Sequence, residues 1–311
     1  MLNEKLEAVL GEKGLVLGDA LTERLIPHGH PGVLLRPQST EEVAAALRLC
    51  NDAGQPVVPY GGLTGLVEAT TADESEVAIS LERMNAIEEI DIASRTMTVQ
   101  AGVPLQVVQE AAEAEGLLFP LDIGARGSAT IGGNVATNAG GNRVIRFGMM
   151  RDQILGMEVV LADGTVLSSM NKIIKNNTGY DLKQLFIGSE GTLGIVTRLV
   201  LKLRPAPTSQ NMAFLAASTF DQVTTLLNRL DAGLGGSLSA FEVMWSDYYE
   251  LVTKPPAAGQ PPVAHGYGFY ILVEALGGDE DADSERFLTV LSEAMEEGIV
   301  ADGAIAQSQG E

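Results

Sequence analysis

The stretch 119–141 concentrates residue types that bind ligands through short side chains and backbone groups. It reads Phe119-Pro-Leu-Asp-Ile-Gly-Ala-Arg-Gly-Ser-Ala-Thr-Ile-Gly-Gly-Asn-Val-Ala-Thr-Asn-Ala-Gly-Gly141. Hydroxyls and amides alternate with glycines, which let backbone N–H groups approach a ligand closely. We expect a surface that holds a flat, anionic molecule. The glycine pairs Gly132-Gly133 and Gly140-Gly141 argue against a core helix, since each glycine costs about 1 kcal/mol relative to alanine.

Two further glycine-rich segments flank this stretch in the sequence. Pro59-Tyr-Gly-Gly-Leu-Thr-Gly65 follows a short predicted strand, and its Thr64 and backbone N–H groups can wrap a pyrophosphate. Asn177-Thr-Gly-Tyr-Asp-Leu182 and Gly188-Ser-Glu-Gly-Thr-Leu-Gly-Ile-Val-Thr197 come later in the chain. The sequence contains neither a Rossmann Gly-x-Gly-x-x-Gly fingerprint in its required context nor a P-loop.

The histidines and the cysteine do not form a metal-binding or nucleophilic pattern. His28 and His30 stand at i, i+2, but no cysteine or further histidine lies near them, so loop residues are favoured over metal ligands. Cys50 falls on the apolar face of the helix that Ser39 and Glu42 open as a capping box, which predicts a core thiol. We expect no metal site.

The net charge and the apolar content of the chain limit the kinds of molecule that it can bind and the compartment in which it can lie. The 311 residues carry a formal net charge of −21, which argues against nucleic acid or an anionic membrane surface as partner. A phosphate-containing ligand must therefore be held by local N–H groups and a few arginines. No apolar run is long enough to span a membrane and the chain opens without a basic, apolar leader. We expect a soluble cytoplasmic protein.

The predicted elements divide the chain into two domains. The residues before Arg204-Pro-Ala-Pro207 predict a first domain, 1–205, with subdomains of about 1–95 and 96–205, and 206–311 predict an α+β second domain. Asp163-Gly164 predicts a two-residue hairpin turn. The expected helices are 2–13, 40–53, 104–115, 220–230 and 283–297, and the expected strands are 56–59, 77–80, 87–92, 96–101, 155–162, 165–168, 195–203, 238–244 and 267–275.

In order and spacing, the three glycine-rich segments resemble the FAD-binding domain of the flavoprotein family that contains vanillyl-alcohol oxidase. Within it they are most similar to the D-2-hydroxy-acid dehydrogenases: the glycolate oxidase FAD subunit, D-lactate dehydrogenase and D-2-hydroxyglutarate dehydrogenase. The resemblance covers roughly residues 30–300. It implies an α+β fold, in which a two-subdomain FAD-binding domain precedes an incomplete α+β cap domain with an antiparallel sheet.

The resemblance also implies the residues that bind FAD. The first loop would hold the pyrophosphate, the central stretch would line the isoalloxazine and ribityl region, and the last segment would close over the adenosine or ribityl side. Many relatives carry further glycines where this chain has Val67-Glu68-Ala69. Members with covalent flavin carry a His or Cys in these segments, which this chain lacks, so we expect non-covalent FAD. The implied residues are Tyr60, Gly61, Gly62, Leu63, Thr64, Gly65, Pro120, Asp122, Gly127, Ser128, Ile131, Gly132, Asn134, Thr137, Asn138, Gly141, Gly191, Gly194, Ile195 and Val196.

Two arginines follow the central stretch directly. Arg143 and Arg146 can offset the charge of a phosphate or substrate carboxylate, or take part in structural ion pairs, and the sequence leaves both alternatives open.

The function implied by the resemblance is oxidation of a small 2-hydroxy acid by hydride transfer to flavin, with electrons passed to an acceptor protein or a quinone; a homodimer is compatible with it. The alternatives are a non-catalytic flavin-binding subunit of a multi-subunit glycolate oxidase and a reductase of a sugar nucleotide. Ser239-Ala-Phe-Glu-Val-Met244 favours the dehydrogenase. Family members carry a His-x-His-x-Gly-Asp-Gly-Asn-x-His segment that His265 does not match, so we expect an incomplete cap domain, with the catalytic residues outside this chain.

Overall fold

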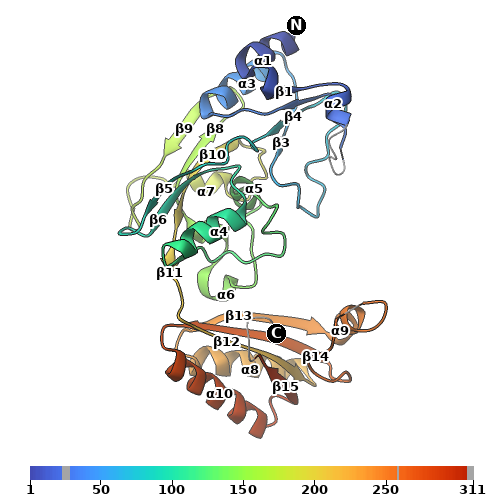
Figure 1. The fold of residues 1–311 in the computed structure, drawn as a ribbon, viewed down its shortest axis with the longest axis vertical. Coiled ribbons are helices and arrows are strands. Elements are labelled where there is room, and N and C mark those ends of the chain that lie inside the picture. The colour runs from blue at the N-terminus through green and yellow to red at the C-terminus, as the bar shows by residue number, and fades with distance from the viewer. Residues whose placement is uncertain (23–28, 258, 307–311) are drawn as a thin grey trace. The chain divides into compact units, whose positions relative to one another are not determined.

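The computed structural model describes residues 1–22, 29–257 and 259–306, and it forms two compact units (Figure 1). The first unit consists of Met1–Gly140 and Met149–Pro205, and the second of Gly141–Gly148 and Ala206–Glu311. The domain boundaries expected from the sequence stay a proposal. His28, expected as a loop residue, lies outside the described residues.

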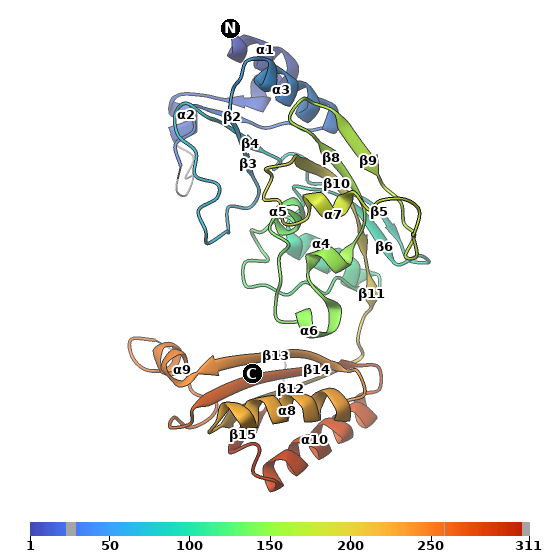
Figure 2. The ribbon, with the colours of Figure 1, turned by 180° about the vertical axis from the view of Figure 1, so that it is seen from behind.

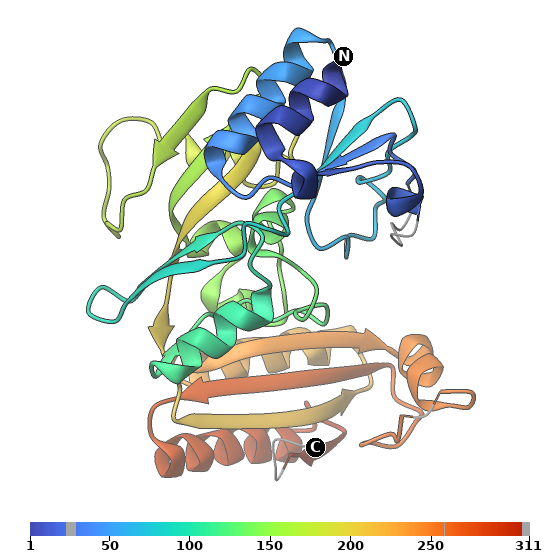
Figure 3. The same ribbon diagram turned by 45° about the horizontal axis from the view of Figure 1, so that its top comes forward.

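The amino-terminal part of the first unit contains a mixed sheet of order β1-β2-β4-β3. β2 and β3 run parallel to β4, and β1 is antiparallel to β2. Helices α1 and α3 lie side by side, as Figure 3 shows. The elements are α1 (Leu2–Leu10), η1 (Glu12–Gly14), β1 (Leu15–Val16), α2 (Asp19–Thr22), β2 (Val33–Leu35), α3 (Thr40–Asp52), β3 (Val57–Tyr60) and β4 (Val77–Ser80).

Helix α3 begins where the sequence predicts. The Ser39 hydroxyl accepts a hydrogen bond from the backbone N–H of Glu42, which satisfies one of the free donors at the helix start. The Glu42 carboxylate accepts from the backbone N–H of Gln38 instead of closing the capping box on Ser39. Cys50, at 1% exposure, is confirmed as a core residue, and burial raises the pKa of its thiol to about 11.

The first unit also contains a second, antiparallel sheet of order β5-β6-β10-β8-β9. The predicted hairpin at Asp163-Gly164 is confirmed: the Asp163 side chain accepts from the backbone N–H of Thr165, and Gly164 has a φ of 79°. Hairpin β5–β6 spans the subdomain boundary expected near residue 95. The strands are β5 (Ile87–Asp91), β6 (Thr96–Gln100), β8 (Ile154–Val160), β9 (Val166–Ser169) and β10 (Ile195–Lys202).

A buried carboxylate connects helix α3 to the second sheet. Glu158 of β8 accepts hydrogen bonds from Thr40 at the start of α3, at 2.6 Å, and from Thr197 of β10, at 3.0 Å. Arg198 lies 3.5 Å from its other oxygen. These bonds compensate for burial of the charge, which would otherwise be strongly unfavourable.

Helix α5 (Ile131–Ala136) shows that the prediction against a helix in the central stretch is wrong. Gly132 of this helix packs against Ala101, the residue directly after β6, and a Cβ added to Gly132 would lie 2.7 Å from the Cβ of Ala101. Close packing therefore outweighs the helix propensity of glycine. The remaining elements of this unit are α4 (Leu105–Ala114), β7 (Leu117–Leu118), η2 (Met150–Gln153), α7 (Lys183–Phe186) and β11 (Arg204–Pro205).

The second unit is an antiparallel sheet of order β13-β14-β12-β15 with α8 and α10 on one face, as Figure 2 shows. Leu215, Val273 and Phe287 belong to the core between the sheet and the helices. The elements are α6 (Val144–Phe147), β12 (Ser209–Ala217), α8 (Phe220–Gly233), β13 (Leu238–Trp245), α9 (Ser246–Thr253), β14 (Phe269–Gly277), α10 (Glu280–Glu296) and β15 (Asp302–Ile305). The predicted α+β class with an antiparallel second-domain sheet is confirmed.

Candidate functional site

The three glycine-rich segments meet in the first unit. A Cβ on Gly62 would lie 2.0 Å from the carbonyl oxygen of Ser128, and one on Gly61 would lie 3.2 Å from Cα of Gly133. A Cβ on Gly191 would lie 2.3 Å from Cγ of Pro59. Contacts this close between backbones require glycine. The fold thus brings together segments separated by more than a hundred positions in the sequence.

Backbone donors are available in the first loop. None of the residues that the structure describes accepts a hydrogen bond from the N–H groups of 61–67. By contrast, the first N–H groups of α5 are already used: Ile131 donates to Val103, Gly132 to Ala101, and Gly133 to the Thr130 hydroxyl. An anion at this site would therefore be held by the 61–67 loop, and not by the start of α5.

Asn134 carries a donor that fits a ligand. The residue is only 5% exposed, and its Nδ2 atom is buried without a hydrogen-bond partner in the part of the chain described. A buried, unpaired amide donor is unfavourable by about 1–3 kcal/mol, so most such groups have partners. Asn134 Nδ2, the Tyr60 hydroxyl and the N–H groups of 61–65 are thus unused donors among the residues expected to bind FAD.

Several expected FAD-binding residues have side chains in the protein core. Ile131, Ile195 and Val196 belong to the main apolar cluster of the first unit. The Tyr60 ring packs against a smaller cluster that includes Leu34 and Ala78. Ile131, Ile195 and Val196 can therefore offer a ligand only their backbone groups, whereas the Tyr60 hydroxyl is buried without a hydrogen-bond partner among the described residues.

The base of the central segment is fixed by side chains. Asn138, with a φ of 48°, accepts a hydrogen bond through Oδ1 from the N–H of Arg151 at 2.9 Å. The Arg151 guanidinium donates to the carbonyls of Gln184 and Ile187 and to the Gln184 side chain. Next to them, Gly188 donates to the Val135 carbonyl. Sequence reasoning missed Arg151, because no local pattern distinguishes it from other arginines.

The other expected residues take up varied positions. Thr137 donates to the Gly133 carbonyl, and Gly194 packs against Val159 and Val160 of β8. Gly141 belongs to the second unit. Leu63 is partly buried and Pro120 is buried, whereas Asp122 is half-buried; Thr64, Gly65, Gly127 and Ser128 are exposed.

Glu68 has the backbone conformation of a glycine. Its φ is 56°, in the left-handed region, and Leu63 in the same loop has a φ of 54°. The resemblance implies further glycines where this chain has Val67-Glu68-Ala69, and the chain keeps a left-handed residue there without a glycine. The loop conformation is therefore strained by about 1 kcal/mol or more at each position.

Arg143 and Arg146 take part in structural contacts in the second unit. Arg143 donates to both carboxylate oxygens of Glu274, at 2.9 and 2.7 Å. Arg146 donates to the carbonyls of Ser237 and Leu276. The sequence left two alternatives open for these arginines, and the structural ion pair is the one observed for Arg143.

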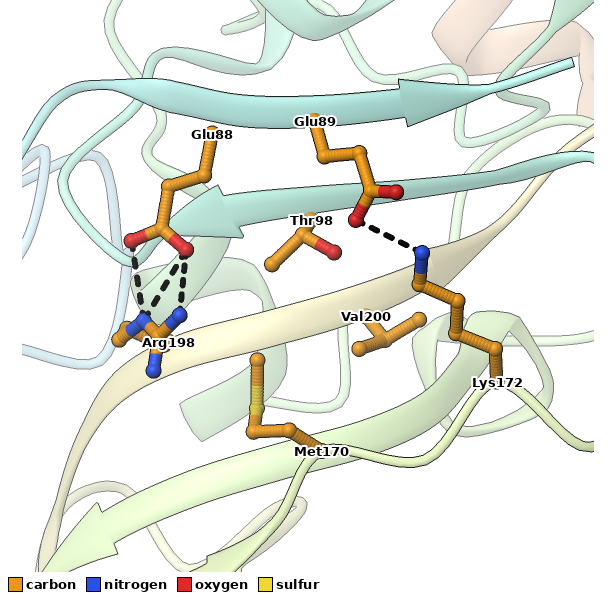
Figure 4. Close-up of a pocket in the computed structure, with 7 residues that line it drawn as sticks. All are labelled: Glu88, Glu89, Thr98, Met170, Lys172, Arg198 and Val200. Atoms are coloured by element: carbon orange, nitrogen blue, oxygen red, sulfur yellow. Dashed lines mark hydrogen bonds and ion pairs between the residues drawn. The ribbon is translucent and has the colours of Figure 1, made fainter.

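A depression on the second sheet of the first unit has no link to the glycine-rich segments (Figure 4). It encloses about 350 Å³ between Thr98, Met170 and Val200. Its two cations are paired, Arg198 with Glu88 at 2.6 Å and Lys172 with Glu89 at 2.7 Å. None of the residues expected to bind FAD lines it, and we assign it no function.

Two parts of the chain match models of known protein families. Residues 31–169 match the family model of the FAD binding domain, and residues 206–311 match that of the FAD linked oxidases, C-terminal domain. The chain thus matches an FAD binding domain followed by the C-terminal domain of FAD linked oxidases, and FAD is the cofactor. These matches confirm the resemblance found in the sequence.

Curated relatives are named as 2-hydroxy-acid dehydrogenases. Mitochondrial D-2-hydroxyglutarate dehydrogenase of Bos taurus is 42% identical over 90% of this chain and 51% of its own length. D-2-hydroxyglutarate dehydrogenase of Xanthomonas citri pv. viticola is 41% identical over 93% of this chain and 60% of its own length. A putative mitochondrial D-lactate dehydrogenase of Schizosaccharomyces pombe is 38% identical over 91% and 54%. The chain thus spans about half the length of these relatives.

Solved structures show the same fold. The chain matches p-cresol methylhydroxylase with a TM-score of 0.79 at 15% identity, covering 99% of this chain and 67% of that one. It matches alkyldihydroxyacetonephosphate synthase with a TM-score of 0.76 at 18% identity, covering 99% and 61%. The vanillyl-alcohol oxidase type of fold expected from the sequence is confirmed.

Groups of three or more His, Cys, Asp or Glu side chains placed to hold a metal ion do not occur among residues 1–22, 29–257 and 259–306. Over the same residues, no helix has the length and hydropathy needed to cross a membrane.

Proposed function

We propose that this chain is the FAD-binding part of a dehydrogenase that oxidises a D-2-hydroxy acid to the 2-oxo acid. The observation that supports the proposal most is the 38–42% identity, over at least 90% of the chain, to relatives named as D-2-hydroxyglutarate and D-lactate dehydrogenases. Among the acids expected from the sequence, D-2-hydroxyglutarate is favoured over D-lactate and glycolate, since most of these names specify it.

Within this proposal, FAD is held by the loop and by α5. The backbone N–H groups of 61–67 donate to the pyrophosphate, and Nδ2 of Asn134 donates to a polar atom of the cofactor. Both sets of donors lack partners among the described residues, so binding removes an unfavourable unpaired group instead of breaking existing bonds. When bound, the flavin supplies the hydride acceptor for the substrate's α-carbon.

We further propose that FAD is bound without a covalent bond. The segments 59–65, 119–141 and 188–197 contain no histidine or cysteine. Cys50 is buried and its pKa is raised to about 11, so its thiolate is scarce at neutral pH. The acceptor of the electrons, a protein or a quinone, the homodimer and the cytoplasmic location stay predictions.

The function is tested by anaerobic reduction of the flavin in the protein that carries this chain. D-2-hydroxyglutarate should bleach the visible flavin absorbance, and L-2-hydroxyglutarate, as the matched control, should not. D-lactate and glycolate, tested in parallel, establish the preferred acid. If none of these acids reduces a flavin that dithionite does reduce, the dehydrogenase proposal fails and the non-catalytic flavin-binding subunit becomes the better description.

A further inference from the structure

Arg151 joins two of the glycine-rich segments within the first unit. Its backbone N–H donates to Oδ1 of Asn138, near the end of the central stretch, at 2.9 Å. Its guanidinium donates to the carbonyl and to Oε1 of Gln184, at 3.0 and 2.6 Å, and to the carbonyl of Ile187 at 2.7 Å. Ile187 directly precedes the segment 188–197, and all of these residues belong to the same compact unit. One residue thus connects two segments that are expected to bind FAD.

The carbonyls that accept from Arg151 lie at the end of a short helix. α7 spans Lys183–Phe186, and Ile187 follows it. The last carbonyls of a helix have no partner within the helix, and a nearby arginine can donate to them and interact favourably with the helix dipole. Hydrogen bonds from a charged donor are also stronger than those between neutral groups. Arg151 therefore fixes the point at which the segment 188–197 begins.

The segment 188–191 contacts both other parts of the expected FAD site. The N–H groups of Gly188 and Glu190 donate to the carbonyls of the last two residues of α5, at 3.0 and 2.8 Å. A Cβ added to Gly191 would lie 2.3 Å from Cγ of Pro59, two residues before the first loop. The segment 188–191 therefore connects α5, which carries the unused donor of Asn134, to the start of the loop with the unused N–H groups.

Two strained residues lie where Arg151 holds the chain. Asn138 has a φ of 48° and Glu190 a φ of 52°, both in the left-handed region. Such conformations are unfavourable for residues other than glycine, and they persist only where the surrounding structure enforces them, which is typical of ligand sites. Arg151 binds Asn138 directly and holds the turn that leads into Glu190. Its bonds thus help to impose both conformations.

We propose that Arg151 is a positioning residue for FAD: it holds 188–191 between α5 and the first loop, and so keeps the donors of both at the spacing that the cofactor requires. This inference rests on the proposed function, in which α5 and the first loop bind FAD together. Fixing donors before the ligand arrives lowers the conformational cost of binding. Phe186 and Ile187 are buried in the core, so without Arg151 the segment should stay attached but lose its fixed conformation.

The test compares FAD affinity in variants of the protein that carries this chain. Arg151→Met removes the guanidinium and keeps an unbranched side chain, whereas Arg151→Lys keeps the charge but not the forked donor geometry. Arg83→Met is the matched control: Arg83 lies in the same unit and donates to the Arg36 carbonyl and to Oε1 of Gln38, outside the glycine-rich segments.

Three measurements are made on each variant. A flavin fluorescence titration gives the dissociation constant for FAD, and hydrogen exchange of the FAD-free protein follows the segment 188–191. Visible circular dichroism at saturating FAD reports the surroundings of the bound flavin, which a loss of stability elsewhere in the unit would leave unchanged.

We expect Arg151→Met to raise the dissociation constant about 10-fold, to speed exchange in 188–191 and to alter the flavin circular dichroism. Arg151→Lys should raise the constant about 3- to 10-fold, because one ammonium group cannot reproduce the fork. Arg83→Met should leave the constant within about twofold of wild type.

The proposal is overturned if Arg151→Met raises the dissociation constant less than about threefold, even where exchange in 188–191 is faster, because Arg151 then has a structural role only. It is also overturned if Arg83→Met weakens FAD binding equally, since the effect is then a general loss of stability. If Arg151→Met does not fold, Arg151→Lys decides by the same criterion.

Failure of this proposal can be distinguished from failure of the proposed function. FAD affinity is measured without any 2-hydroxy acid, so the role of Arg151 is tested even if none of the acids reduces the flavin. Conversely, unchanged FAD affinity in the Arg151 variants does not alter the outcome of the reduction experiment.

Discussion

Gly62 and Ser128 are in backbone contact: a methyl group on Gly62 would lie 2.0 Å from the Ser128 carbonyl oxygen. The glycines of the first loop were expected to make room for the ligand. At Gly62 the space is needed for another segment of the protein. At Gly65, by contrast, an added Cβ would meet nothing within 4 Å.

The two glycines therefore predict different effects of the same substitution. Gly62→Ala should lower the free energy of unfolding by about 1–3 kcal/mol and weaken FAD binding, because the loop must move away from Ser128. Gly65→Ala, the matched control, should leave the Tm of the FAD-free protein unchanged. Thermal unfolding with and without FAD measures both effects, and equal Tm values for the FAD-free variants would contradict the packing described.

Asn134 should affect the FAD-bound protein more than the FAD-free protein. Asn134→Leu removes an unpaired buried donor, so the FAD-free Tm should stay the same or rise, while the increase in Tm caused by FAD should shrink. Asn171→Leu is the control, since Oδ1 of Asn171 is also buried and unpaired but lies outside the glycine-rich segments. A full FAD-induced increase in Asn134→Leu would exclude this side chain from the cofactor site.

Glu68 should tolerate glycine better than any β-branched residue. Its φ of 56° is free of strain only for glycine, so Glu68→Gly should keep or raise the free energy of unfolding by up to about 1 kcal/mol. Glu68→Val should lower it by about 1–2 kcal/mol. Glu68→Gln removes the charge alone and separates electrostatic effects on FAD affinity from conformational ones. The idea is wrong if Glu68→Gly and Glu68→Val unfold at the same denaturant concentration.

The Arg143–Glu274 pair should make stability depend on acid pH. Burial alone would raise the pKa of Glu274, but the hydrogen bonds and charge of Arg143, with those of Ser239 and Gln210, hold the pKa below its ordinary value of 4.5. Such a carboxylate stabilises the folded state at pH values above 4.5, and this contribution is lost as pH falls through the folded-state pKa.

Glu274→Gln should accordingly reduce the free energy of unfolding by about 3 kcal/mol at neutral pH, and the difference from wild type should shrink below about pH 4.5. Denaturant unfolding across this pH range measures the difference. The double variant Arg143→Met/Glu274→Leu should be less destabilised than either single variant, because no buried charge is left unpaired. A pH-independent difference would mean that Glu274 is not ionised in the folded protein.

Local sequence patterns determined much of the fold. The capped start of α3 at Ser39, the hairpin at Asp163-Gly164 and the strand at Val77–Ser80 follow from interactions within a few residues, and all three are present in the structure. The family was also accessible, because the order and spacing of the glycine-rich segments are themselves sequence properties. Periodicity and turn chemistry require no knowledge of distant neighbours.

Only the tertiary structure decided the roles of several single residues. Gly132 lies in a helix, where helix propensity alone predicted none, and the position needs glycine because Ala101, 31 positions earlier, leaves no room for a side chain. Arg143 pairs with Glu274 and Arg151 donates to Gln184 and Ile187, partners that no spacing in the sequence indicates. The reason is physical: close packing and charge pairing depend on which distant segments become neighbours, and only the folded chain determines that.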